Sequence, residues 1–274
     1  MNEAPPPCEA PYSLATGSAA VRRLTALHDV YSPAGRRVLL QSGLKQGMTV
    51  ADFGCGVGMT TRMLAELVGP SGTVTGIDIS SAQLNEARNI CAAKGLHNVT
   101  FHEAGACESG LSRNSFDLAY CRFLLLHLPN PAACLHEMLD ILKPGGILVI
   151  EDGDLTSATS HPPGATNAFA DLFGRLGPTR GLDYSMAKNL YALFKAAGCK
   201  NITIEIHQPA ITAGINRNLM KWSVEEAADS FVSAGLISAD DLARTLVDMQ
   251  QQVDDPNVLL LGPKMFIVAG TKAH

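Results

Sequence analysis

The chain reads VADFGCGVG at residues 50–58, so three glycines stand at alternate positions after a short apolar run that contains an acid. A glycine loop between a strand and a helix lets the backbone approach a bound nucleotide closely. A dinucleotide fingerprint, Gly-x-Gly-x-x-Gly, would need its third glycine where this chain has Met59. A triphosphate-binding loop would end in Gly-Lys-Ser/Thr, whereas the chain reads Gly58-Met59-Thr60. The loop therefore disfavours both kinds of phosphate site.

Apolar runs and helical patterns alternate around the loop. Strands are expected at 49–53, 73–79, 99–103, 116–121, 146–151, 202–207 and 265–271. Helices are expected at 59–68, 80–94, 165–197 and 216–251, and also at 18–42, where Ser32-Pro33 leaves open one helix or two. Strands that alternate with helices form doubly wound sheets. We therefore predict an α/β fold with a mostly parallel, doubly wound, seven-stranded sheet.

The same pattern predicts three parts of one fold. Residues 1–45 are expected to hold an N-terminal segment and helices that close over the site, and residues 46–152 the ligand-binding core. After residue 152 a polar loop leads to helices inserted before the last two strands, so residues 153–274 are expected to form a helical lid together with those strands. Because the final strand returns to the sheet, we expect no independent second domain.

The composition excludes several classes of protein. Of the 274 residues, 46% are apolar and 17% are charged, which fits a well-buried sheet and not a disordered chain. The net charge of −5, with Lys and Arg scattered singly, argues against a nucleic-acid partner. No apolar run reaches 18 residues and the seven cysteines form no CxxC pair, so we expect reduced thiols in a cytoplasmic protein with no membrane span and no metal site. The sequence leaves open whether the chain forms homo-oligomers.

A second acid, Asp78, follows the glycine loop in the stretch TGIDIS at residues 75–80. At the carboxyl end of the second strand its side chain reaches the crevice beside the loop, where two oxygens can accept both hydroxyls of a ribose. The loop and Asp78 together predict a site for a nucleoside without phosphates.

Four motifs in this order resemble those of class I S-adenosylmethionine-dependent methyltransferases. They are Asp-x-Gly-x-Gly-x-Gly at 52–58, the acid at 78, Phe116-Asp117-Leu118, and Leu142-Lys143-Pro144-Gly145-Gly146. The resemblance covers residues 35–152 and is most similar to small-molecule enzymes of ubiquinone and menaquinone biosynthesis. It implies a Rossmann-like fold that binds S-adenosylmethionine and releases S-adenosylhomocysteine. In such proteins Asp117 and the turn at 143–146 are structural.

The resemblance implies roles for residues of the core. Gly54, Gly56 and Gly58 would let the loop pass under the methionine and ribose portions of the cofactor. Asp78 would bind the ribose hydroxyls, and Ile79 would pack against the adenine.

The adenine edge departs from the family pattern. Such proteins usually have an acid after the third strand that faces the adenine amino group, and here that position is Gly105. The backbone of Ala106 and Cys107 would then serve the adenine, with Glu108 or Glu103 as an acceptor.

Residues outside the glycine loop are implied at the methionine portion. Asp52 would organise the loop near the methionine amino group. In similar enzymes a Tyr and an Arg from the N-terminal segment close over the cofactor, and Tyr12 and Arg23 match that layout. Arg23 would pair with the methionine carboxylate or else be a solvated helix residue, and Arg122 is its rival for that pairing.

Methyl transfer from a sulfonium ion needs alignment of the acceptor and exclusion of water, and it needs a general base only when the acceptor must lose a proton. The candidate bases are His161, beyond the fifth strand, and His127, after the fourth. The alternatives are a surface loop for His161 and a helix cap for His127. Glu151 and Asp152 are expected either to point into the crevice and orient the substrate, or to be solvated at the strand end.

Apolar side chains of the expected lid predict a partly hydrophobic acceptor pocket. They are Phe169, Phe173, Leu190, Tyr191, Phe194, Met220, Trp222 and Phe231. We therefore predict O-, N- or C-methylation of a medium-sized small molecule of secondary metabolism, such as a quinone precursor, polyketide, terpenoid or alkaloid. The alternative is an S-adenosylmethionine-binding cyclase or rearrangement enzyme on the same fold. The intact glycine loop and Asp78 disfavour a non-catalytic binding subunit.

Overall fold

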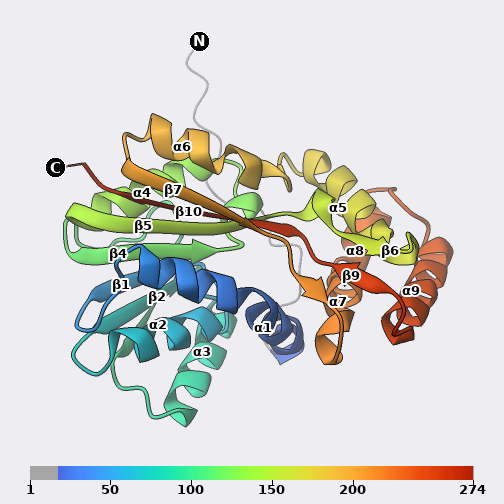
Figure 1. Cartoon of the computed structure of the whole chain (residues 1–274), viewed down its shortest axis with the longest axis horizontal. Helices are drawn as coiled ribbons and strands as arrows, with labels where there is room; N and C mark the ends of the chain where they lie inside the picture. Colours follow the sequence, from blue (N-terminus) through green and yellow to red (C-terminus); the bar gives the residue numbers. More distant parts are fainter. Residues whose placement is uncertain (1–17, 274) are drawn as a thin grey trace.

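The computed structural model describes residues 18–273. Its centre is a seven-stranded sheet in the order β3-β2-β1-β4-β5-β10-β7 (Figure 1). The pairs among β1 to β5 are parallel, and β10 runs antiparallel to both of its neighbours. In this order the strands span Val99–Glu103, Thr73–Asp78, Thr49–Phe53, Phe116–Arg122, Leu142–Asp154, Lys264–Thr271 and Lys200–His207. The mostly parallel α/β sheet of seven strands predicted from the sequence is thereby confirmed.

Three core helices, α2 (Met59–Val68), α3 (Ser81–Ala93) and α4 (Pro131–Ile141), connect these strands. The Ser80 side chain caps α3 by accepting a hydrogen bond from the Gln83 backbone N–H at 3.3 Å. The Asn130 side chain caps α4 by accepting from the Ala133 backbone N–H at 3.2 Å, and Pro131 occupies the first turn. The capping side chains accept hydrogen bonds from backbone N–H groups that have no partner within the helix. Proline suits the first turn because it has no N–H group there to be left without a partner.

The N-terminal helix α1 (Ser18–Gln41) is continuous over 24 residues, although Pro33 lies inside it. A proline inside a helix removes one backbone donor, so the sequence left open one helix or two. Burial of Tyr31 and Leu39 holds the helix on the protein, and the Tyr31 hydroxyl donates to the carbonyl oxygen of Pro263 at 2.9 Å. Tertiary packing therefore outweighs the local cost of the proline.

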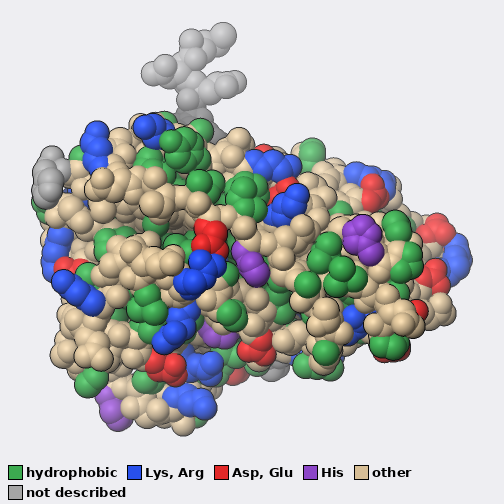
Figure 2. Space-filling model, in the orientation of Figure 1, with side chains coloured by type: hydrophobic (Ala, Val, Ile, Leu, Met, Phe, Trp, Pro, Cys, Tyr) green, Lys and Arg blue, Asp and Glu red, His purple; other side chains and the backbone are tan. Residues whose placement is uncertain are grey.

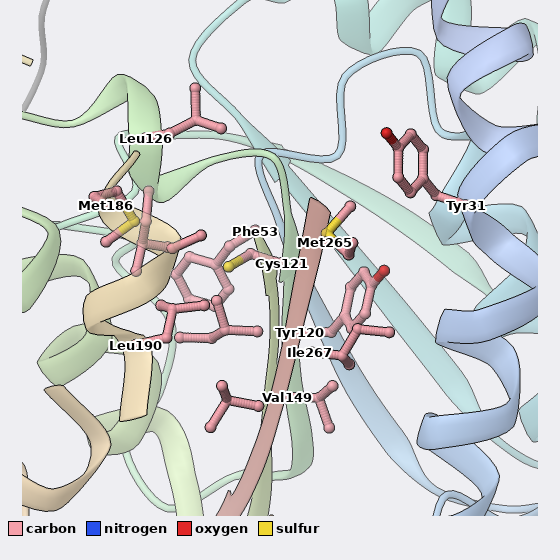
Figure 3. Packing of buried hydrophobic residues seen from close by; sticks show 14 of the residues in the cluster. Tyr31, Phe53, Tyr120, Cys121, Leu126, Val149, Met186, Leu190, Met265 and Ile267 are labelled. Carbon is pink, nitrogen blue, oxygen red and sulfur yellow. The ribbon is translucent and has the colours of Figure 1, made fainter. Parts of the chain in front are cut away.

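The core occupies both faces of the main sheet (Figure 3). Tyr120 and Ile267 project towards the side of α1, whereas Phe53 and Cys121 project towards the helical segment that carries Leu190. Successive residues of a strand point to opposite faces, which explains why Tyr120 and Cys121 of β4 diverge. Strand β4 is the central strand of the seven, and most of its side chains are buried, on both faces of the sheet.

Residues inserted on either side of β7 build a second region, most of which gathers at one end of the sheet (Figure 1). Helices α5 (Ala168–Thr179) and α6 (Leu190–Ala196) precede β7, and α7 (Leu219–Glu226), α8 (Ala228–Ser233) and α9 (Ala239–Asp254) follow it. Short strands β6 (Thr159–His161), β9 (Leu259–Leu261) and β8 (Ala210–Ile211) form an antiparallel three-stranded sheet. This small sheet was not predicted from the sequence, because strands of two or three residues are too short to show an alternation of apolar and polar residues.

Short 3-10 helices join several of these elements. They are η1 (Leu125–His127), η2 (Leu155–Ser157), η3 (Ala165–Asn167), η4 (Met186–Asn189) and η5 (Ile215–Asn218). Two of them, η1 and η4, contact each other, so they join the end of β4 to the segment before α6.

A buried arginine holds the inserted region together. Arg217 of η5 is only 6% exposed, and its guanidinium donates hydrogen bonds to six backbone carbonyl oxygens. These belong to Ile211, Thr212, Gln252, Val253, Asp255 and Val258, at 2.7 to 3.4 Å. Three of the six lie at the C-terminal end of α9, where the helix dipole favours a positive charge. One side chain thus connects β8, α9 and the segment before β9.

The face drawn in Figure 2 carries Lys and Arg side chains scattered among Asp and Glu. No continuous basic stripe is visible on this face of the described residues.

Candidate functional site

The glycine loop between β1 and α2 turns through left-handed backbone. The φ angle is 65° at Gly54, 53° at Gly56 and 76° at Gly58, a region that residues with a side chain rarely adopt. A Cβ atom added at Gly54 would lie 2.8 Å from Leu124 Cδ1, and one at Gly58 would lie 2.8 Å from Ala87 Cβ. The loop therefore needs glycine for its conformation and for close packing.

Replacing Gly58 with alanine is expected to lower the free energy of unfolding by about 2–5 kcal/mol, from the left-handed backbone and the overlap with Ala87. Gly95→Ala is the matched control, because its φ is 67° and nothing lies within 4 Å of an added Cβ atom. The control should lose only the backbone contribution, roughly 1–2 kcal/mol. Urea denaturation of both variants measures the difference, and equal losses would contradict the packing role of Gly58.

Asp78 braces the loop from the end of β2. Its Oδ2 accepts the backbone N–H of Gly56 at 2.9 Å, and its Oδ1 accepts the backbone N–H of Ser80 at 2.9 Å. Burial raises the pKa of Asp78, and these backbone hydrogen bonds act in the opposite direction. Each carboxylate oxygen has a further lone pair, so Asp78 can also accept hydrogen bonds from hydroxyl groups of a ligand.

One cavity of about 390 Å³ extends from the loop into the inserted region. Asp78 and the exposed side chain of Ile79 line it beside the loop. Helix α1, the end of β4, α5 and α7 supply an apolar half. The side chains of that half include Leu27, Phe123, Leu126, Phe169, Phe173, Leu219 and Met220. The glycine loop with Asp78 and a group of apolar side chains therefore line the same cavity.

Asp52 lies under the loop, outside the set of described residues that line the cavity. Its Oδ2 accepts the Thr61 hydroxyl at 2.6 Å, which ties β1 to α2. Burial raises the pKa of Asp52 to about 7, partly offset by the Thr61 hydrogen bond and the Arg122 charge. Asp52 thus joins the strand before the loop to the helix after it.

The segment after β3 reaches the cavity through Ala104 and Ala106. Gly105 pairs with Glu108 in an isolated β-bridge, and the Ala104 backbone N–H donates to the Asp78 carbonyl at 3.1 Å. Cys107 is disulfide-bonded, so the expectation of reduced thiols is wrong at this position. Five other cysteines are free, namely Cys55, Cys91, Cys121, Cys134 and Cys199.

Two arginines line the cavity and differ in their partners. Arg23 is buried and forms an ion pair with Glu226, with 2.7 Å between Nε and Oε2, so its alternative as a solvated helix residue is wrong. Arg122 donates from Nη2 to His28 Nδ1 at 3.1 Å, while its buried Nη1 has no hydrogen-bond partner among the described residues. Arg122 therefore has a donor available for a ligand. Tyr12 lies outside the described residues.

The two candidate bases occupy different places. His127 lines the cavity, and its ring stacks edge-to-face with Tyr184 at a centroid distance of 5.8 Å. Burial, followed by the positive charges of Arg23 and Arg180, lowers the pKa of His127 to about 3, which makes it a weak base. Helix α4 is capped by Asn130, so the capping alternative for His127 is wrong.

His161 does not reach the cavity. It is exposed and pairs with Leu259 between β6 and β9, away from the described residues that line the cavity. The prediction of His161 as a base next to the acceptor therefore does not agree with its position. The sequence could not reveal this because the small sheet that carries His161 has no pattern of its own.

Glu151 and Asp152 are fully buried and are absent from the described cavity lining, so both expectations for them are wrong. The reason is the length of β5, which continues to Asp154 and pairs with β10 at both positions. Asp152 accepts the backbone N–H groups of Leu126 and Gly153 at 3.1 and 2.9 Å. Burial raises the pKa of both acids to about 7.

The sequence analysis missed Phe123 and Tyr31 as cavity residues. Phe123 follows β4 with φ of 50°, a strained conformation for an aromatic residue of the kind that often occurs at functional sites. Its ring packs edge-to-face with Tyr31 at 5.2 Å, and a Cβ atom at Gly153 would overlap it. Neither position carries a recognisable signal in a single sequence.

The described part of the chain lacks two further kinds of feature. Within residues 18–273, no helix combines the length and apolar character needed to cross a bilayer. In the same part of the chain, no group of three or more His, Cys, Asp or Glu side chains is placed to hold a metal ion.

Known proteins that are similar to this chain in sequence or in fold include methyltransferases. Residues 44–206 match the model of a methyltransferase domain family. A demethylmenaquinone methyltransferase from Listeria monocytogenes serotype 4a is 34% identical over 151 residues, which are 54% of this chain and 61% of that protein. The chain thus spans about three fifths of this curated relative.

Two solved structures share the fold. One, of a putative methyltransferase from Bacillus halodurans, is 16% identical with a TM-score of 0.60, covering 87% of this chain and 98% of that one. The other, of a SAM dependent methyltransferase from Aquifex aeolicus, is 19% identical with a TM-score of 0.55, covering 93% and 99%. The fold is therefore the Rossmann-like methyltransferase fold, and because the family model matches residues 44–206 this chain belongs to the methyltransferase domain family.

Proposed function

We propose that this chain transfers the methyl group of S-adenosylmethionine to a medium-sized, partly hydrophobic small molecule. The observation that supports this most strongly is the cavity beside the glycine loop, because it has that loop and Asp78 at one end and apolar side chains at the other. A methyl donor and an acceptor must meet in one water-poor space for displacement at the sulfonium carbon. Family membership supports the same proposal.

The residues of the nucleoside end fit the cofactor. We assign the ribose hydroxyls to Asp78, whose oxygens keep lone pairs free, and the adenine to Ile79 and the backbone at Ala106. Cys107 is not among the described residues that line the cavity, so this assignment does not include it.

Arg122 is the better partner for the methionine carboxylate. Arg23 already forms an ion pair with Glu226. Arg122, in contrast, contacts the neutral His28 ring and has a buried Nη1 with no hydrogen-bond partner among the described residues. A charge-assisted hydrogen bond to a carboxylate would satisfy that donor. Asp52 would act on the methionine end indirectly, through the loop that it holds.

The apolar half suits a quinone precursor, polyketide, terpenoid or alkaloid. Phe169, Phe173, Leu219 and Met220 would contact the body of such an acceptor, and His127 is a neutral hydrogen-bonding group among them. Among the described cavity residues, neither His127 nor Tyr31, whose pKa burial raises, is suited to act as a base near neutral pH. An acceptor whose reacting group ionises readily, or is already nucleophilic, fits this lining best.

The proposal is tested by calorimetric titration with S-adenosylhomocysteine, followed by incubation of the enzyme with methyl-labelled S-adenosylmethionine and candidate acceptors. Binding together with label transfer would support it. No binding at high micromolar concentration would refute the cofactor assignment. Binding with conversion of a substrate but without label transfer would favour the alternative cyclase or rearrangement enzyme, and binding without any conversion would favour a non-catalytic subunit.

The two histidines are expected to respond differently to substitution. His127→Ala should raise the KM for the acceptor by about tenfold, the equivalent of one lost hydrogen bond and its packing. His161→Ala should change neither kcat nor KM by more than about twofold, because distant surface substitutions are nearly neutral. Steady-state kinetics on both variants checks this. A large loss of kcat/KM in His161→Ala would show that His161 takes part in the reaction.

A further inference from the structure

A group of buried polar side chains from β4 and β5 packs against α1. Arg122 of β4 and Glu151 of β5 are register partners in the parallel sheet, so their side chains lie on the same face. Tyr120 lies two residues before Arg122 and projects to the side of α1 (Figure 3). Arg122 reaches the cavity lining, whereas Glu151 does not. Arg122 therefore stands between Glu151 and the space where a ligand would bind.

Glu151 is an unusual acid for the interior of a sheet. Its side chain is completely buried, and neither carboxyl oxygen has a hydrogen-bond partner among the described residues. The Tyr120 hydroxyl interacts with it but is also without a partner at hydrogen-bond geometry. A Cβ atom at Gly35 of α1 would overlap the Glu151 carboxyl group, so the helix carries a glycine where the acid needs space. An unpaired buried acid costs stability and calls for a function.

Arg122 is the cation that acts on Glu151. Burial raises the pKa of Glu151 to about 7, and the largest opposing cause is the charge of Arg122. The Arg122 guanidinium has one nitrogen bound to His28 and one buried nitrogen without a partner among the described residues. When another anion pairs with Arg122, the positive charge that favours ionised Glu151 is therefore weakened.

We propose that Glu151 is the counter-ion of Arg122 and takes up a proton from solvent when the carboxylate of a bound cofactor pairs with the Arg122 guanidinium. This inference rests on the proposed function, because it assigns that carboxylate to Arg122. A ligand carboxylate neutralises the charge that favours ionised Glu151, so the protonated form gains. Glu151 thereby acts through Arg122: it balances part of the Arg122 charge while the site is empty, without a direct hydrogen bond, and it is protonated when the ligand supplies a carboxylate.

Other groups facing this cluster are accounted for separately. His28 of α1 has its pKa lowered to about 3, by burial first and then by Arg122, so it stays neutral near pH 7. Tyr31 of α1 and Tyr120 of β4 have their pKa raised by burial. Glu205 of β7 pairs with Arg37 of α1, which lowers the pKa of that carboxyl, so it stays ionised.

Asp52 of β1 is the one group of this cluster, among the described residues, that titrates in the same range as Glu151. Its pKa is also about 7, and Arg122 acts on it as well. A bound methionine ammonium group would favour ionised Asp52 and release a proton, which opposes the uptake by Glu151. The experiment must therefore compare variants at Glu151 and not rely on the net proton count alone.

The test is calorimetric titration of S-adenosylhomocysteine at pH 7 in buffers of different ionisation enthalpy, which counts the protons taken up. S-adenosylhomocysteine is the chosen probe because it has the carboxylate but no sulfonium charge. We expect the wild type to take up about half a proton more than Glu151→Gln, a difference that vanishes at pH 5, where Glu151 is already protonated without the ligand. Methylthioadenosine, which lacks the carboxylate, should give equal counts in both proteins.

Three outcomes are distinguishable. Binding with equal proton counts in the wild type and Glu151→Gln would overturn the inference and leave the proposed function intact. No binding of S-adenosylhomocysteine by the wild type would refute the proposed function and the coupling with it. If Glu151→Gln does not fold, the δ-carbon NMR signal of Glu151 in the wild type gives the same answer. Its pKa should rise when S-adenosylhomocysteine is added, and an unchanged value would overturn the proposal.

Discussion

Asp78→Ala is expected to weaken the binding of S-adenosylhomocysteine by about 100-fold or more. Hydrogen bonds from two ribose hydroxyls to a carboxylate contribute about 3 kcal/mol together, which corresponds to that factor. The substitution also releases the backbone N–H of Gly56, so the glycine loop loses a brace. Isothermal titration calorimetry measures the affinity, and circular dichroism confirms that the variant is folded.

Asp117→Asn is the matched control for that experiment. Asp117 lies near the start of β4, where it accepts the Thr49 backbone N–H at 2.8 Å and pairs with Lys143 at 2.6 Å. It belongs to the strand end opposite the cavity, so its loss should leave the affinity unchanged. A folded Asp78→Ala variant that binds S-adenosylhomocysteine as tightly as the wild type would refute the ribose contact.

Arg217→Met is expected to lower the free energy of unfolding by about 4 kcal/mol, because buried carbonyl groups lose their charged donor. Methionine fills much of the same space, so the loss measures the hydrogen bonds more than a cavity. The six carbonyl groups come from β8, α9 and the loops beside them. Urea denaturation measures the stability, and limited proteolysis should show cleavage within residues 210–260 at an earlier stage than in the wild type.

Arg244→Met in α9 is the control for the arginine substitution. Arg244 is exposed and pairs with Asp241 in the same helix. Exposed ion pairs of this kind contribute about 0.5 kcal/mol or less. Equal destabilisation by the two substitutions would show that the carbonyl contacts of Arg217 do not hold the inserted region.

The sequence revealed those parts of the fold that depend on local patterns. Apolar runs between turn residues marked the seven main strands, and the glycine loop with Asp78 marked one end of the cavity. Both signals are local, because a strand end and the turn that follows it are contiguous in the chain.

Features that depend on long-range contacts were not predictable. Glu151 and Asp152 look like the end of a strand in the sequence, but β10, more than a hundred residues later, covers them. Helix α1 continues through Pro33 because its buried face packs on the protein. The apolar half of the cavity combines side chains from α1, α5 and α7, whose helical spacing alone does not distinguish a pocket wall from a core.

Arg217 has a consequence for how acid and base act on this protein. A guanidinium stays protonated at every pH at which a protein folds, and backbone carbonyls do not titrate. The carbonyl groups that accept from Arg217 therefore keep their state when the pH changes, while burial raises the pKa of Asp52, Glu151 and Asp152 to about 7. A change in ligand affinity between pH 6 and pH 8 is thus expected to originate at these three carboxyl groups and not at the carbonyl contacts of Arg217.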